Sequence, residues 1–153
     1  MEAIKIRSAK ENDSKDIFEW RNDELTRQMS KTSEIIEWEN HKRWYSNSLG
    51  SESRIVLICE DNRNEKIAII RFDISESNAF ISINLNPNQR GKGLAKSCLI
   101  GSIEFFSKEY IEIKNLIAEI KEDNIASQKT FLGIGFTKYN LKDNVGFYKK
   151  ILV

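Results

Sequence analysis

Proline and cysteine are nearly absent from this chain. Its 153 residues include a single proline, Pro87, and two cysteines, Cys59 and Cys98. Cys59 ends the apolar run RIVLIC and Cys98 lies inside a helical pattern, which indicates two buried free thiols in a reducing cytoplasm and not a disulfide or a metal-binding pair. We therefore predict no metal site.

An excess of one charge and long hydrophobic runs are also missing. The 24 Lys+Arg and 23 Asp+Glu residues nearly cancel, which argues against nucleic acid or an anionic membrane as a partner. No apolar run approaches the roughly 18 residues that span a bilayer, and the N-terminal MEAIKIRSAKEND lacks the apolar core of a signal peptide. We expect a cytoplasmic protein folded as one domain over residues 1–153.

What the chain does contain is a regular alternation of strand and helix patterns. Helical patterns begin at the potential caps Asn12 to Ser14, at Ser33, at Gly93 and at Asn124. The predicted strands cover residues 3–9, 54–62, 66–75, 78–86, 115–120, 136–141 and 146–153. About three antiparallel strands thus lead into a glycine-containing loop and a long helix, without a linker.

The stretch NLNPNQRGKGLAKSCL, which begins at Asn84, holds Pro87, Gly91 and Gly93 between a strand and a helix. Glycines let a ligand approach the backbone, and N–H groups at a helix N-terminus bind phosphate. The spacing fits neither the GxxxxGK[ST] P-loop nor the GxGxxG dinucleotide fingerprint. From these residues alone, an anion cradle and a plain strand-to-helix turn are both open.

The segment Arg90-Gly91-Lys92-Gly93-Leu94-Ala95 resembles the R/Q-x-x-G-x-G/A signature of the GNAT acetyltransferase family. Downstream, the family's strand–loop–helix block, with an Asn, a Ser three residues later and a Gly-Phe pair, is similar to Asn124, Ser127, Gly135 and Phe136. The resemblance covers nearly the whole chain. It implies an α+β fold, with a mostly antiparallel sheet of six to seven strands flanked by about four helices.

The resemblance also implies acetyl-CoA as co-substrate, with its pyrophosphate on the glycine loop. In this family the fourth strand splays from the fifth, and its free backbone groups bind the pantetheine and the thioester carbonyl. The expected cofactor-binding residues are Ile83, Asn84, Leu85, Arg90, Gly91, Lys92, Gly93, Leu94, Ala95, Asn124, Ser127 and Phe131.

Glu119 is the expected general base. Ribosomal-protein N-terminal acetyltransferases of the same family carry a catalytic Glu at the matching place, although an outward-facing Glu on an alternating strand is the alternative. Many family members place a Tyr seven residues after the Asn to protonate the thiolate, but this chain has Phe131 there. Tyr139 or Tyr148 could replace that Tyr, yet ordinary packing explains both, and solvent can also protonate the thiolate.

The segment from Trp20 to Trp44 should carry the acceptor site. It resembles the WRN…R…M…H…W pattern of the sugar-nucleotide N-acetyltransferases, which acetylate the 4-amino group of UDP-linked amino-dideoxy sugars. The alternative for the tryptophans is a place in the core, and for His41 a surface or capping role. The expected substrate-binding residues are Trp20, Arg21, Asn22, Arg27, Met29, His41 and Trp44.

Three functions follow from this sequence. The first is acetylation of a sugar-nucleotide amine. The second is another GNAT reaction, on a peptide N-terminus, a ribosomal protein or a small amine. The third is a catalytically silent acyl-CoA-binding module, which Phe131 favours and Glu119 disfavours. A monomer and a homodimer are both compatible with the sequence.

Overall fold

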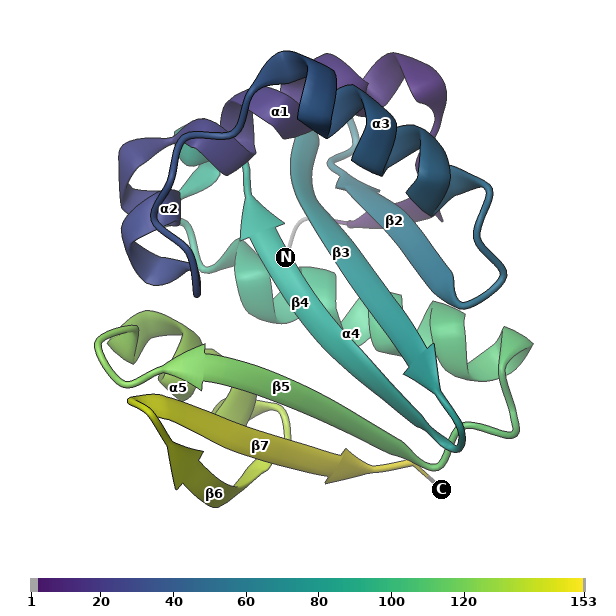
Figure 1. Cartoon of the computed structure of the whole chain (residues 1–153). Helices are drawn as coiled ribbons and strands as arrows, with labels where there is room; N and C mark the ends of the chain where they lie inside the picture. Colours follow the sequence, from purple (N-terminus) through teal and green to yellow (C-terminus); the bar gives the residue numbers. More distant parts are fainter. Residues whose placement is uncertain (1–2, 153) are drawn as a thin grey trace.

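A computed structural model describes residues 3–152, which contain seven strands. Their bounds are β1 Lys5–Ser8, β2 Arg54–Glu60, β3 Lys66–Ser75, β4 Asn78–Leu85, β5 Asn115–Lys121, β6 Thr137–Lys142 and β7 Val145–Ile151. They form one sheet in the order β1-β2-β3-β4-β5-β7-β6 (Figure 1). Neighbouring strands are antiparallel except β4 and β5, which are parallel. The predicted α+β fold with a mostly antiparallel sheet is confirmed.

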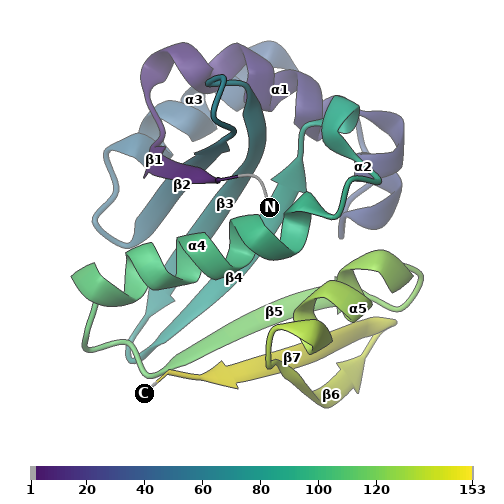
Figure 2. The same cartoon turned by 180° about the vertical axis from the view of Figure 1, so that it is seen from behind.

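Helices cover both faces of this sheet. The helices are α1 Ser14–Asn22, α2 Glu24–Met29, α3 Trp38–Leu49, α4 Leu94–Glu109 and α5 Ile125–Gly133. Helices α1 and α3 lie over one face, whereas α4 crosses the other face, and α5 lies on the α4 side against β5 (Figures 1 and 2). The short helix α2 lies beside the end of β4.

Two apolar clusters hold these layers together. The larger cluster lies between the sheet and α4, where Phe72 of β3 stacks on Phe106 with ring centroids 4.1 Å apart. The smaller cluster joins α1 and α3 to the opposite face through Ile17, Tyr45 and Ile58. Because successive strand residues point to opposite faces, a sheet covered on both sides needs the continuous apolar runs of β2 and β3.

The parallel strands β4 and β5 pair over a short length. Asn78, Ala79 and Phe80 pair with residues 115–117 of β5. Beyond Phe80 the two strands diverge (Figure 1), and the structure of residues 3–152 has no pairing between residues 81–85 and β5. This divergence is the splay that the family resemblance implied, and it opens the sheet at the carboxyl ends of both strands.

The predicted start of the second helix at Ser33 is wrong, because α3 begins at Trp38. Side chains satisfy the backbone of the intervening segment in place of helical hydrogen bonds. The amide of Asn22 bonds both N–H and C=O of Ile36, at 2.7 and 2.8 Å. Arg27 Nη1 donates to the carbonyl of Ser33 at 3.0 Å. The segment before α3 is therefore held as an irregular strap.

The two cysteines are buried and free, as predicted. Cys59 of β2 and Cys98 of α4 both have no exposed surface. Its hydrogen bond to the Cys59 sulfur, together with burial, raises the pKa of the Cys98 thiol.

Candidate active site

A cleft of about 530 Å³ opens where β4 and β5 diverge. Its lining comes from α1, α2, α3, β3, β4, β5, α5 and the loop before α4. Two parts of its wall are named here. The loop side consists of Arg90, Gly91, Ala95, Asn124, Ser127 and Phe131, and the β3 side consists of Ile17, Arg21, Trp44, Ile69 and Arg71. Glu119 also lines the cleft.

The loop before α4 presents bare backbone. Gly91 and Gly93 have φ angles of +72° and +71°, in the left-handed region that favours glycine. A Cβ added to either would meet no atom within 4 Å, so both glycines border open space. Gly93 is the N-cap of the 16-residue α4 and carries no capping side chain. The first N–H groups of α4 are therefore free to bind an anion.

The cations of this loop are used within the protein. Arg90 Nη2 donates to the carboxylate of Asp23 and, at 2.8 Å, to Thr26 Oγ1. This hydrogen bond from Arg90 lowers the pKa of Asp23. Lys92 Nζ lies 3.3 Å from Gln89 Oε1. Arg90 thus ties the loop to α2, while the backbone of the loop stays available.

The open edge of β4 offers a second set of backbone groups. Asn86 N–H donates to Ile67 O at 2.8 Å. Since hydrogen-bonded and non-bonded pairs alternate in an antiparallel ladder, Asn84 is also bonded to β3, whereas Ile83 and Leu85 are not. The N–H and C=O groups of Ile83 and Leu85 therefore face the splay, and the backbone of Asn84 does not.

Helix α5 borders the cleft with three of the predicted cofactor residues. Asn124 accepts a hydrogen bond from Ser127 N–H at 3.2 Å, so its side chain caps the helix. Phe131 is 3% exposed and packs edge-on against Phe136, with ring centroids 5.0 Å apart. Lys92, Gly93 and Leu94 belong to the loop but do not themselves line the cleft. The contact of these residues with acetyl-CoA stays a prediction.

Glu119 lies at the centre of the cleft wall. Its neighbours Ala118 and Ile120 are buried in the core, whereas the Glu119 carboxylate is 25% exposed. Its Oε1 accepts a hydrogen bond from Lys31 Nζ at 2.9 Å. Lys31 follows α2, so this ion pair spans the cleft and leaves Oε2 without a cation.

Neither tyrosine considered as general acid lies in this cleft. Tyr139 is 50% exposed on β6, and Tyr148 is 2% exposed inside the larger core cluster. Neither is among the described residues that line the cleft. Ordinary packing therefore explains both residues.

On the β3 side, Arg21 lies flat against Trp44, with Cζ 4.1 Å from the ring centroid. Arg21 Nη1 is 3.0 Å from His41 Nδ1. His41 Nε2 lies 2.9 Å from the carbonyl of Ser14, which can only accept, so Nε2 is the donor and Nδ1 accepts from Arg21. Burial, together with the charge of Arg21, lowers the pKa of His41 and keeps the ring neutral.

The structure brings only some of the predicted acceptor residues to the cleft. Arg21, Arg27, Met29 and Trp44 line it. His41 has no exposed surface and contacts two residues of the cleft wall, Arg21 and Trp44.

Two further predicted acceptor residues are used inside the fold. Trp20 is 6% exposed in the smaller core cluster, and Asn22 is bonded to Ile36. These two residues support α1 and do not form the cleft wall.

Sequence reasoning missed Arg71 and Lys31. Arg71 lies on β3, and its Nε is 3.2 Å from Asp73 Oδ2 without a hydrogen-bonding angle. The signal for Arg71 was present, because it interrupts the apolar run KIAIIRF. Lys31 has no comparable signal, since it lies in a polar segment.

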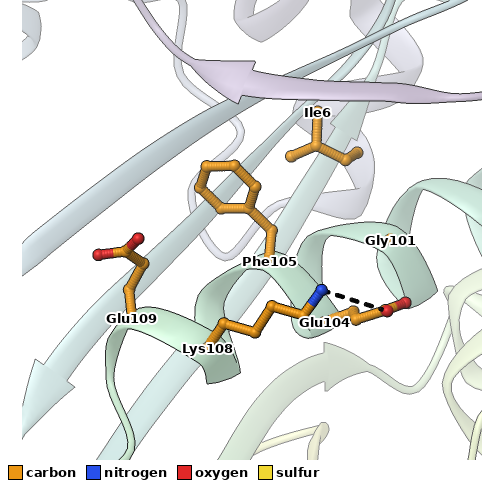
Figure 3. Close-up of a pocket in the computed structure, with 6 residues that line it drawn as sticks. All are labelled: Ile6, Gly101, Glu104, Phe105, Lys108 and Glu109. Carbon is orange, nitrogen blue, oxygen red and sulfur yellow. Dashed lines mark ion pairs between the residues drawn. The ribbon is translucent and has the colours of Figure 1, made fainter.

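A separate pocket of about 280 Å³ lies between β1 and α4 (Figure 3). Gly101 allows the close packing there, because a Cβ at this position would meet Ile6 at 3.3 Å. Lys108 and Glu104 on its rim are 3.7 Å apart. This pocket shares no lining residue with the cleft.

Two further observations concern metal binding and membrane spanning. Over residues 3–152, the structure contains no group of three or more His, Cys, Asp or Glu side chains able to hold a metal ion. Within the same residues, every helix is too short or too polar to cross a membrane.

Comparisons with known proteins agree with this architecture. The family model described as "Acetyltransferase (GNAT) domain" matches residues 4–137. A search of curated protein sequences finds no match.

Solved structures share the fold along the whole chain. A domain from Methanocaldococcus jannaschii is 25% identical, with a TM-score of 0.83, covering 99% of this chain and 100% of that one. Spermidine N-acetyltransferase from Vibrio cholerae, solved with CoA and spermine, is 15% identical, with a TM-score of 0.86 and coverages of 97% and 95%. A provisionally assigned phosphinothricin N-acetyltransferase is 23% identical, with a TM-score of 0.82 and coverages of 99% and 99%.

These comparisons give no support to the sugar-nucleotide subtype that the sequence suggested. They do support the broader prediction, because the family match spans most of the chain and the splayed sheet and glycine loop are in place. The chain belongs to the GNAT family of acetyltransferases and is an N-acetyltransferase that uses acetyl-CoA.

Proposed function

We propose that the enzyme transfers acetyl from acetyl-CoA directly to the primary amine of a small molecule. The cleft carries this proposal, because it runs from the loop side past Glu119 to the β3 side. Its volume of about 530 Å³ suits a small molecule. Both cysteines are buried outside its lining, which supports direct transfer without a covalent carrier.

Backbone groups would hold the donor. The pyrophosphate of acetyl-CoA would bind the free N–H groups around Gly91 and Gly93 at the start of α4. The pantetheine would lie along the open edge of β4, beside Ile83 and Leu85. A backbone N–H from this edge would stabilise the oxyanion of the tetrahedral intermediate, a contribution of about 3 kcal/mol.

Glu119 would accept the proton of the attacking amine, directly through Oε2 or through a water. The amine nitrogen would attack the thioester carbonyl to form the tetrahedral intermediate, and collapse of that intermediate would break the C–S bond and release CoA as a thiolate. The thiolate then takes a proton from solvent, which is compatible with Phe131 at the place of the family's tyrosine. The ion pair with Lys31 would hold the carboxylate in place beside the cleft.

The charge of the wall favours a small amine over a peptide N-terminus or a polyamine. An acceptor that is itself strongly cationic needs an acidic groove. Arg21 and Arg71 line the β3 side, whereas the cleft carboxylate nearest the reaction, Glu119, already has Lys31 as its partner. A sugar nucleotide remains one candidate within the class of small amines.

The test measures release of the free CoA thiol with a panel of amines. The panel contains amino acids, a UDP-4-amino-4,6-dideoxy sugar, the same sugar without UDP, spermidine, an aminoglycoside and a ribosomal-protein N-terminal peptide. A small amine should give the highest kcat/KM. If the peptide leads by about tenfold or more, the cleft is a peptide groove. If CoA binds but no amine releases thiol, the proposed reaction is refuted.

A further inference from the structure

The β3 side of the cleft gathers positive charge around one aromatic ring. The guanidinium carbons of Arg21, Arg71 and Arg54 lie 4.1, 5.6 and 5.8 Å from the centroid of Trp44. Asp73 is the carboxylate in contact with this group, through Arg54 Nε at 2.6 Å and Arg71 Nε at 3.2 Å. Asp73 thus pairs with two of the three cations, Arg54 and Arg71, and Arg21 has no carboxylate partner among the described residues.

The two arginines of the β3 side, Arg21 and Arg71, have hydrogen-bond donors that the described residues do not use. Arg21 makes one hydrogen bond, to His41, and the described residues supply it with no carboxylate. Arg71 makes no hydrogen bond among the described residues, and its buried Nε is unsatisfied. Arg54, in contrast, is bonded to Asp73 and Ser48 and does not line the cleft.

The closeness of these guanidinium groups is electrostatically unfavourable. Burial, and next the charges of Arg71 and Arg54, lower the pKa of Arg21 to about 10. Arg21 is half-buried and the Arg71 side chain is 32% exposed, and an anion offsets the desolvation of such partly buried guanidinium groups. Arg21 is also held in place, since neutral His41 anchors it to Ser14 and Trp44 supports its face.

We infer that the acceptor amine carries an anionic oxygen group, a carboxylate or a phosphoryl group, that binds between Arg21 and Arg71 beside Trp44. This inference rests on the proposed function, whose acceptor class it narrows. Planar guanidinium groups bind such anions with two parallel hydrogen bonds, which fixes direction as well as position. The anion would be held at one end of the acceptor, and the amine would extend along the cleft to Glu119.

Matched substrate pairs test the inference. 4-Aminobutyrate is compared with butylamine, and 2-aminoethyl phosphate with ethanolamine, so that the two pairs separate a carboxylate from a phosphoryl group. In at least one pair, the amine that carries the anionic group should exceed its partner without that group in kcat/KM by roughly 10- to 100-fold. If thiol release occurs but spermidine or the amines without an anionic group react as well or better, the inference is overturned and the proposed function stands.

Single substitutions test whether Arg21 and Arg71 cause the preference for the anionic amine. Arg71→Met and Arg21→Met should remove the advantage of the anionic amine while leaving the Kd of CoA unchanged. Arg71→Lys keeps the charge and should retain part of the advantage. Arg43→Met is the matched control, because Arg43 is an exposed cation of α3 that does not line the cleft. Melting curves identify any variant that does not fold. If a methionine variant does not fold, the advantage of the anionic amine in kcat/KM is measured with Arg71→Lys instead.

A binding experiment is independent of turnover. Tryptophan emission is titrated with inorganic phosphate or acetate while CoA is saturating, so that the glycine loop is occupied. One of the two anions should bind to the wild type about tenfold more tightly than to Arg71→Met. Binding that is equal in both proteins would overturn the inference, even if no acetylated amine had been found.

Discussion

The loop side and the β3 side of the cleft are built from different parts of the chain. On the loop side, a ligand meets backbone N–H groups beside Gly91 and Gly93 and at the edge of β4. On the β3 side, it meets the side chains of Arg21, Trp44 and Arg71, which come from α1, α3 and β3. The first set suits the cofactor that the family shares, whereas the second would bind the acceptor in the reaction that we propose.

Glu119, which lies between the two sides, should give the largest effect when changed. Glu119→Gln keeps the shape but cannot take the amine proton, so kcat should fall about 10²- to 10⁴-fold with little change in the Kd of CoA. Steady-state kinetics and calorimetric titration of CoA measure the two quantities. Glu122→Gln is the control, because Glu122 pairs with Lys138 outside the cleft. A wild-type rate for Glu119→Gln would remove Glu119 from the mechanism.

The buried carboxylate of Asp13 lies directly before α1, the helix that carries Arg21 of the β3 side. Asp13 has no exposed surface and contacts Arg7 at 2.8 Å and Lys66 at 2.7 Å. Asp13→Asn should lower the free energy of unfolding by about 3 kcal/mol, measured by denaturant titration. Asp123→Asn, at an exposed position, should leave it nearly unchanged.

The loss of stability caused by Asp13→Asn should become smaller as the pH falls. Burial alone would raise the pKa of Asp13, but hydrogen bonds from Arg7 and Lys66 outweigh burial and hold the pKa well below its ordinary 3.8. The contribution of Asp13 to stability is therefore present above about pH 4 and is lost as the pH falls further. The gap between wild type and Asp13→Asn should shrink on acidification. A constant gap would mean that the carboxylate charge is not the cause.

Gly93→Val should damage the loop side alone. The branched side chain would occupy the open space beside Gly93 and would strain a φ of +71°. The Kd of CoA should rise roughly 100-fold, by a loss of about 2.7 kcal/mol of binding free energy. Gly50→Val is the control, since Gly50 ends α3 with a φ of −90°. An unchanged Kd would place the cofactor elsewhere.

His41→Leu should damage the β3 side alone. Without the acceptor nitrogen, Arg21 loses its anchor, so KM for the acceptor should rise about tenfold while the Kd of CoA stays constant. His41→Asn places an amide oxygen near the position of Nδ1 and should recover part of the loss. If both variants show an unaltered KM, His41 serves only to pack α1 against α3.

The double variant Cys59→Ala, Cys98→Ala should show the smallest effect on turnover. Both thiols lie in the core behind the sheet, so stability should fall while kcat of the folded protein remains. Labelled acetyl-CoA provides the check. Radiolabel retained on either cysteine during turnover would contradict direct transfer.

Local patterns in the sequence predict the loop side and the fold well. Gly91 and Gly93 are needed at their positions because of their positive φ angles, and the continuous apolar runs of β2 and β3 indicate a sheet covered on both faces. Such requirements involve only a few neighbouring residues. The strands follow from these local patterns, whereas the splay at β4 was implied by the family resemblance.

The β3 side is less predictable because contacts distant in sequence decide it. His41 lies on a helix in a pattern that also suits a ligand contact, but packing against Phe18 and Tyr45 buries it. The start of α3 was misplaced because Asn22, in another helix, satisfies the backbone at Ile36. The residues around His41 and Ile36 in the sequence do not indicate these distant contacts.

The short parallel pairing of β4 with β5 also bears on how the molecule folds. Strands β2 to β4 follow one another in the chain, and β5 to β7 fall within residues 115–151. Within each group the strands pair antiparallel. Over residues 3–152, only three residue pairs of the parallel ladder between β4 and β5 join the two groups, which α4 separates in the sequence. Contacts between residues close in sequence form first. The two groups of strands should therefore gain hydrogen-exchange protection independently, and the parallel pair of β4 and β5 should gain it last. The opening between β4 and β5, where we propose that acetyl-CoA binds, is thus also the seam along which the native state would separate.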